Sequence, residues 1–141
     1  MSVDFRERKV ARKRVFLSFI VGDRKQVDGL RLLGANPNYD LEFYDESVRV
    51  PFESLNAGYI KQKIREKIGR TTVTVCLISE GTHESTWVDW ELEGSAEKDN
   101  TIIAMALKGV ERAILPRLIR DKQLPFHAWD PQHLARLITE S

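Results

Sequence analysis

Residues 71–79, TTVTVCLIS, form the most strongly apolar and β-branched stretch of the chain. β-Branched side chains favour extended backbone, and a strand that is apolar on both faces is typical of the interior of a parallel sheet, because helices cover both faces of such a sheet. This stretch therefore predicts a central strand in a parallel sheet that is covered by helices.

Shorter apolar runs on either side of this stretch have the length and composition of further strands. These runs lie at residues 14–20, 41–44, 101–107 and 125–129. Segments with helical periodicity alternate with them, at residues 23–33, 59–69, 86–98 and 131–138. Such alternation predicts an α/β fold, namely a flavodoxin-like open parallel sheet of four to five strands with helices on both faces.

The length of 141 residues fits one domain. We expect residues 14–141 to form this single domain, with a short helix around Arg117 in the otherwise unassigned segment 108–123. Residues 1–13 are rich in Arg and Lys, and we expect a basic N-terminal arm that is exposed to solvent.

Charge and cysteine content narrow the functional classes. The formal net charge of +1 provides no field that would attract nucleic acid, so we expect no nucleic-acid partner. Cys76 is the single cysteine, which fits a reducing compartment, and its mid-strand position predicts a buried core thiol.

No apolar run approaches the ~20 residues that span a bilayer, and the N-terminus lacks the apolar segment of a secretory signal. We therefore expect a cytoplasmic protein without a membrane partner.

Several familiar ligand sites are absent from the sequence. It contains neither a dinucleotide-binding G-x-G-x-x-G motif nor a P-loop. His83, His127 and His133 are scattered along the chain without the spacing of metal ligands, so we expect no metal site and no bound cofactor.

A ligand site in an open α/β sheet lies at the carboxyl ends of the strands. The first predicted strand delivers Ser18 and Phe19 to that edge, the second delivers Asp45, and the third delivers Ser79. A tryptophan-containing helix, residues 86–98, follows the third strand directly. These polar and aromatic side chains are the candidates for a binding site.

Glu91 stands out on that helix. Successive residues of an α-helix are rotated by about 100°, and in this arrangement Glu91 is the only charged residue on the apolar arc of the helix, one turn after Trp87. A carboxylate in that position is either desolvated for a function or neutralised by a structural partner, and the helical pattern alone leaves both readings open. Trp90 is predicted to lie on another side of the helix, as a surface anchor or an interface residue.

Three segments together resemble one known family. They are RVFLSFIVGD at residues 14–23, VTVCLISEGTHESTWVDWELEGS at residues 73–95 and NTIIAMAL at residues 100–107. They look like the TIR-like family of bacterial Thoeris defence proteins, the ThsB type, which is a branch of the TIR superfamily. The longest segment is the most specific, because it joins an apolar strand, a Ser/Gly/Thr turn and a helix that opens W-V-x-x-E.

The resemblance implies a TIR-like fold and cleavage of the nicotinamide–ribose bond of NAD, which would be a substrate and not a cofactor. The product in that family is a cyclic or modified ADP-ribose, which activates a separate effector protein after phage infection. The catalytic glutamate of the family falls on Glu91, and its preceding aromatic residue falls on Trp87. Ser18 and Phe19 match the loop that borders the nucleotide, and Asp45 matches a polar position after the second strand.

Simple chemistry is compatible with that assignment. Departure of nicotinamide leaves an oxocarbenium-like ribose, which a nearby carboxylate can stabilise, and no strong general acid is needed because cationic nicotinamide leaves as a neutral molecule. Trp87 and Phe19 could supply flat surfaces for a ring to stack on.

Two other functions fit the same residues. One is a non-catalytic TIR-like interaction or nucleotide-sensing module, which would self-associate through Trp90 and the loop at residues 45–57. The other is an enzyme similar to nucleoside deoxyribosyltransferases, which also use a glutamate on a flavodoxin-like sheet.

Overall fold

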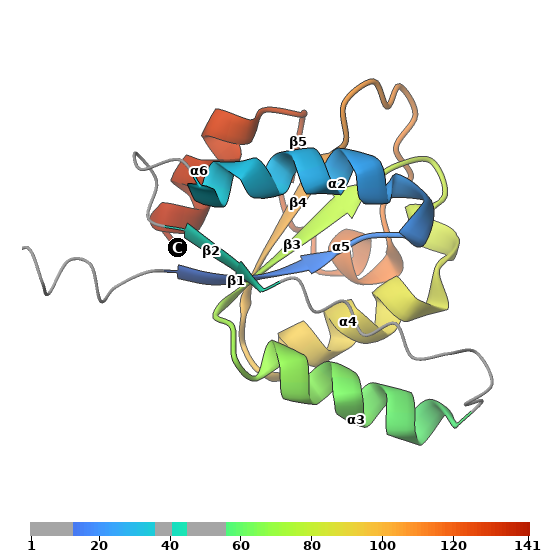
Figure 1. Cartoon of the computed structure of the whole chain (residues 1–141). Helices are drawn as coiled ribbons and strands as arrows, with labels where there is room; N and C mark the ends of the chain where they lie inside the picture. Colours follow the sequence, from blue (N-terminus) through green and yellow to red (C-terminus); the bar gives the residue numbers. More distant parts are fainter. Residues whose placement is uncertain (1–12, 36–40, 45–55) are drawn as a thin grey trace, which may run out of the picture.

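The computed structural model describes residues 13–35, 41–44 and 56–141. These residues form a five-stranded sheet in the order β2-β1-β3-β4-β5 (Figure 1). Every neighbouring pair of strands is parallel. The strands are β1 (Lys13–Ser18), β2 (Leu41–Tyr44), β3 (Val73–Ile78), β4 (Thr101–Ala106) and β5 (Phe126–His127). The predicted flavodoxin-like parallel sheet is therefore confirmed.

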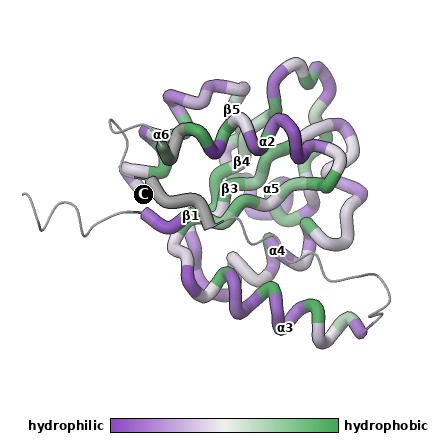
Figure 2. The backbone as a smooth tube through the Cα atoms, in the orientation of Figure 1, coloured by the Kyte–Doolittle hydropathy of each residue, from purple (hydrophilic) through white to green (hydrophobic). Residues whose placement is uncertain are grey.

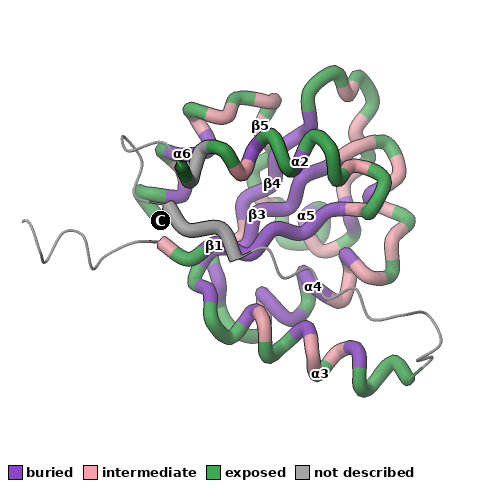
Figure 3. Tube along the Cα trace, viewed as in Figure 1, coloured by how far each residue is buried: buried purple, intermediate pink, exposed green. Residues whose placement is uncertain are grey.

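The predicted central strand is β3, and all six of its residues are buried. It pairs with β1 on one side, where Val15 is opposite Val73, and with β4 on the other, where Thr101 is opposite Val73. The strands in the middle of the sheet are buried in Figure 3 and largely hydrophobic in Figure 2. Burial on both faces explains why this strand has no polar alternation.

Helices cover both faces of the sheet (Figure 1). Helices α2 (Arg24–Arg31) and α6 (Pro131–Thr139) lie on one face, where their apolar side chains pack in one cluster with alternate residues of β1, β3 and β4. Helices α3 (Ala57–Ile68), α4 (Thr86–Glu97) and α5 (Arg117–Asp121) lie on the other face and pack against the intervening strand residues. Successive side chains of a strand point to opposite faces, so the sheet supplies both cores.

Helix α5 confirms the short helix expected around Arg117. The other predicted helices are also present, and 3-10 turns at Val21–Asp23, Leu32–Ala35 and Thr82–Glu84 add to them. Most of the predicted basic arm (residues 1–12), and residues 45–55 of the loop after β2, lie outside the described residues. No helix in the described part of the chain is long and apolar enough to cross a membrane.

The start of α4 differs from the sequence pattern, in which Thr86 and Asp89 resemble a capping box. Ser85 caps this helix instead, and its side chain accepts a hydrogen bond from the backbone N–H of Val88 at 3.1 Å. Ser85 has the extended backbone that an N-cap requires, whereas Thr86 is already helical.

Candidate functional site

Ser18 and Glu91 meet at the carboxyl end of β1. The Ser18 hydroxyl donates a hydrogen bond to Oε1 of Glu91 at 2.9 Å, and both residues are 0% exposed. Ser18 is the last residue of β1 and Glu91 lies in the middle of α4. The structure therefore brings together two residues that the sequence places in a site, at the edge of the sheet where ligands of this fold class bind.

Helix α4 is held against the sheet by a chain of buried hydrogen bonds. The Ser95 hydroxyl donates to the backbone carbonyl of Glu91 at 2.8 Å and lies 2.6 Å from the Thr74 hydroxyl of β3. The side-chain amide of Asn100 donates to the hydroxyls of Thr74 and Thr71, at 3.2 and 3.0 Å. Since buried polar groups are costly to leave unpaired, this network favours one position of α4 relative to β3. That position is the one in which Glu91 faces Ser18.

Cys76 lies in β3 under α4 and is 0% exposed. Burial raises the pKa of its thiol well above the usual range, and the charges of Glu91 and Asp89 raise it further. The thiol therefore stays protonated and uncharged, and the predicted buried core thiol is confirmed.

Trp87 and Trp90 lie side by side on α4. Their ring centroids are 6.4 Å apart with planes tilted by 39°, and both rings pack against the cluster that Phe16 forms with α3. The prediction that Trp90 lies on another side of the helix from Trp87 is wrong, because residues three apart on a helix are neighbours. Both rings are partly buried, and Lys61 of α3 places its ammonium 5.3 Å from the centre of the Trp90 ring.

Phe19 is only 1% exposed and belongs to the core cluster beneath α2. The guanidinium of Arg31 lies 5.8 Å from the centre of its ring. The ring is therefore covered by protein in this structure, and it presents no open face on which a ligand could stack.

Ser79 follows β3 and joins a polar cluster at the same edge of the sheet. Its hydroxyl donates to Oδ2 of Asp23 at 2.6 Å, and its backbone N–H donates to the hydroxyl of Thr82 at 2.8 Å. The sequence predicted Ser79 but missed Asp23. Asp23 is the first charged residue after the predicted strand at residues 14–20, and this position could have identified it, since the segment that follows a strand must lie at the same edge of the sheet. Asp45, also predicted, lies outside the described residues.

The histidines are less scattered than the sequence suggests. His127 and His133 meet edge to face with ring centroids 5.2 Å apart. Burial lowers the pKa of His127, and the neighbouring His133 lowers it further. Across residues 13–35, 41–44 and 56–141, no group of three or more potential metal-ligating side chains gathers in one place.

Comparisons with known proteins agree with this architecture. The family model of the Thoeris protein ThsB, TIR-like domain, matches residues 16–112. Among solved structures, the TIR domain of the Toll-related receptor TRR-2 from Hydra magnipapillata is similar, with a TM-score of 0.57 and 14% sequence identity. That match covers 89% of this chain and 91% of the Hydra chain, and at this identity it supports the fold alone. No curated protein matches the chain.

Proposed function

Because the chain belongs to the TIR-like domain family of the Thoeris protein ThsB, we propose that it cleaves the nicotinamide–ribose bond of NAD in antiphage defence. Glu91 is the catalytic carboxylate in this proposal. NAD is the substrate, and the reaction needs neither a metal nor a bound cofactor. The product is a cyclic or modified ADP-ribose that diffuses to a separate effector protein.

The hydrogen bond between Ser18 and Glu91 carries the proposal. A carboxylate with 0% exposure is costly, and here it receives a hydroxyl hydrogen bond of 2.9 Å at the ligand-binding edge of the sheet. The bond fixes one carboxylate oxygen and so orients the group. An oriented carboxylate in a site shielded from water can stabilise the positive charge that develops on the ribose as nicotinamide leaves.

The remaining residues have distinct roles in the proposal. Trp87, one turn before Glu91, supplies an aromatic surface beside the carboxylate. Ser79 lies at the same edge of the sheet, where it can contact the polar part of the substrate together with Asp23. Asp45 keeps the substrate-binding role that the family resemblance implies. Phe19 has a structural role in the proposal and packs in the core, because its ring is covered by protein.

Burial of Glu91 sets a condition on the reaction. A side chain with 0% exposure reaches a substrate only after the groups that cover it have moved, so the protein must open around Glu91 before it turns over. Self-association is one process that could stabilise such an opened state. We therefore expect the specific activity to rise with protein concentration.

Mass spectrometry of the products tests the proposed function. The purified chain is incubated with NAD at low and high protein concentration, with Glu91→Gln alongside. Nicotinamide together with a cyclic or conjugated ADP-ribose, both absent with the variant, is the expected result. Incubation with free nucleosides separates this reaction from deoxyribosyl transfer. Turnover that persists in the variant, or the absence of turnover at every concentration, would contradict the proposal.

A further inference from the structure

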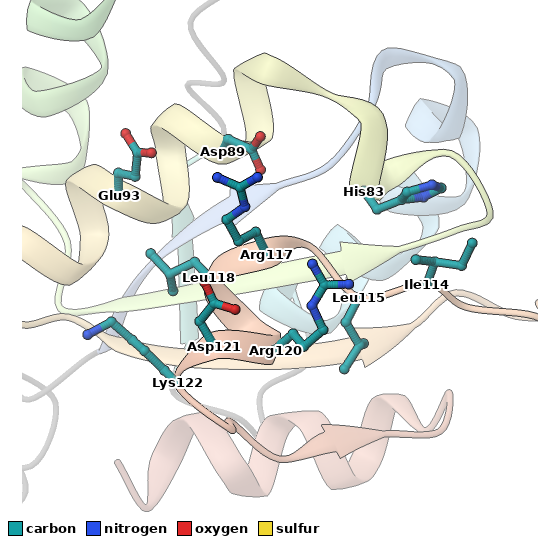
Figure 4. A pocket seen from close by; sticks show the side chains of 10 residues that line it. All are labelled: His83, Asp89, Glu93, Ile114, Leu115, Arg117, Leu118, Arg120, Asp121 and Lys122. Atoms are coloured by element: carbon teal, nitrogen blue, oxygen red, sulfur yellow. The ribbon is translucent and has the colours of Figure 1, made fainter.

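A pocket of about 530 Å³ lies on the side of α4 that faces away from Glu91, between α4 and α5 (Figure 4). Its walls come from the turn before α4, from α4 itself, and from the segment that runs through Ile114 into α5. Glu91 is not among the lining residues. The volume falls within the range of about 300–1,000 Å³ that is usual for small-molecule sites.

Two arginines of α5 dominate the chemistry of this pocket. Arg117 and Arg120 are three residues apart, so they share one face of the helix, and Figure 4 shows both reaching from α5 toward α4. Neither guanidinium forms an ion pair with any of the described residues. A guanidinium presents a planar fork of donors that matches the oxygens of a phosphate group.

Acidic side chains limit the size of the anion. Asp89 lies above Arg117 in Figure 4, and Glu93 and Asp121 also line the pocket. Burial raises the pKa of Asp89, Glu93 raises it further, and Arg117 lowers it, so Arg117 already balances part of the charge of Asp89. Arg120 and Lys122, which also lines the pocket, are the remaining cations, and of these two Arg120 has the planar fork of donors that suits a phosphate group. The surrounding carboxylates would repel an extended polyanion such as nucleic acid more strongly than one compact phosphate group next to Arg120.

The rest of the wall is apolar. Leu115 and Leu118 are partly buried, and Ile114, which is 48% exposed, extends this apolar wall. An exposed isoleucine beside two leucines offers a surface for an uncharged ring or chain. The pocket thus combines an anion-binding group and an apolar wall within the dimensions of one small molecule.

We propose that this pocket binds a small ligand with one phosphate group, which pairs with Arg120 and Arg117 while an uncharged part lies on Ile114, Leu115 and Leu118. The site is separate from Glu91 and does not depend on the proposed NAD cleavage. AMP is a suitable probe, because it joins one phosphate to a flat ring system.

Methyl-detected NMR on the full chain tests this site. AMP should shift the methyl resonances of Ile114, Leu115 and Leu118, and Arg120→Gln should weaken AMP binding about tenfold or more, because a charge-assisted hydrogen bond is lost. Arg117→Gln should weaken AMP binding less, since Asp89 already neutralises part of the charge of Arg117. Adenosine, which lacks the phosphate, and inorganic pyrophosphate, which lacks the ring, should each bind more weakly than AMP.

Two variants serve as matched controls. Arg136→Gln removes an exposed cation from α6 on the opposite face of the sheet and should leave AMP binding unchanged. Glu91→Gln should also leave the shifts at the three methyl-bearing residues unchanged. Equal AMP affinity in Arg120→Gln and the unmodified chain would overturn the proposal. So would adenosine binding as tightly as AMP, or AMP shifts that are confined to the surroundings of Glu91.

Discussion

The hydroxyl of Ser18 lies 2.9 Å from Oε1 of Glu91 and links the end of the first strand to the middle of α4. Both residues are fully buried, so this hydrogen bond operates away from bulk water. Hydrogen bonds to charged groups are stronger in such surroundings, and their loss leaves a buried charge poorly satisfied.

Replacing Ser18 by alanine should therefore affect both stability and turnover. We expect Ser18→Ala to lower the free energy of unfolding by about 1.5–3 kcal/mol, because Glu91 loses the hydrogen bond to its Oε1. Nicotinamide release from NAD should fall at a temperature where the variant is still folded. Urea unfolding and a turnover assay on the same preparation measure the two effects. Full activity in the folded variant would show that Ser18 does not orient the carboxylate.

The buried network under α4 should contribute mainly to stability. Thr74→Val keeps the shape of the side chain but removes the hydroxyl that contacts Ser95 and Asn100. We expect a loss of about 1–3 kcal/mol in the free energy of unfolding. Thr101→Val is a matched control on β4, where the threonine is exposed, and it should change stability by less than about 0.5 kcal/mol. Equal effects of the two changes in urea unfolding would contradict the role given to the network.

The N-cap of α4 predicts different effects on stability for two neighbouring residues that both carry a hydroxyl group. Ser85→Ala removes the acceptor for the Val88 N–H and should cost about 1 kcal/mol of stability. Thr86→Ala should be neutral or slightly stabilising, because Thr86 is exposed in the first turn and alanine is the better helix former. Thermal unfolding of both variants decides between the observed cap and the capping box that the sequence suggests. A larger loss for Thr86→Ala would favour the capping box.

The histidine pair should give a pH-dependent contribution to stability. The pKa of His127 is lower in the folded chain, owing to burial and then to His133. The folded state therefore binds fewer protons at His127, and the corresponding stability is present above the unfolded pKa of about 6.5 and is lost as the pH falls below it. His133→Gln removes one of the two causes of the lowered pKa of His127. The free energy of unfolding of this variant should therefore decrease less between about pH 7 and 5 than that of the unmodified chain. Parallel pH profiles in urea unfolding would rule out this interaction.

Some features of the molecule could be predicted from the sequence because each follows from a local pattern. Residues 73–78 are apolar on both faces, which predicts the central strand and with it the parallel sheet. Glu91 lies on the apolar arc of its helix, a position that indicated either a desolvated carboxylate or one neutralised by a structural partner, and the structure shows that it is buried. The placement of Ser18 and Ser79 at one edge followed from the rule that parallel strands end together.

Other features depend on contacts between distant segments, which no local pattern contains. The hydrogen bond of Ser79 to Asp23 depends on how the turn after β1 folds back, and the contact of Trp90 with Trp87 and α3 depends on how two helices pack. The pocket beside α5 was missed for a different reason. Arg117 and Arg120 are exposed charged residues, and in a sequence such residues look like ordinary surface.

The most direct test of the central claim compares two glutamates on the same helix. Glu91 is buried next to Ser18, whereas Glu97 is exposed at the end of α4, where it lies 3.6 Å from Arg65 in a surface ion pair. Glutamine has nearly the same shape as glutamate, so both substitutions mainly remove charge. We measure nicotinamide release from NAD by Glu91→Gln, Glu97→Gln and the unmodified chain, at a protein concentration where the unmodified chain turns over, with thermal unfolding of each.

We predict that Glu91→Gln remains folded and loses turnover, while Glu97→Gln keeps the activity of the unmodified chain. A folded Glu91→Gln variant that still releases nicotinamide at the normal rate would contradict the assignment of Glu91 as the catalytic carboxylate.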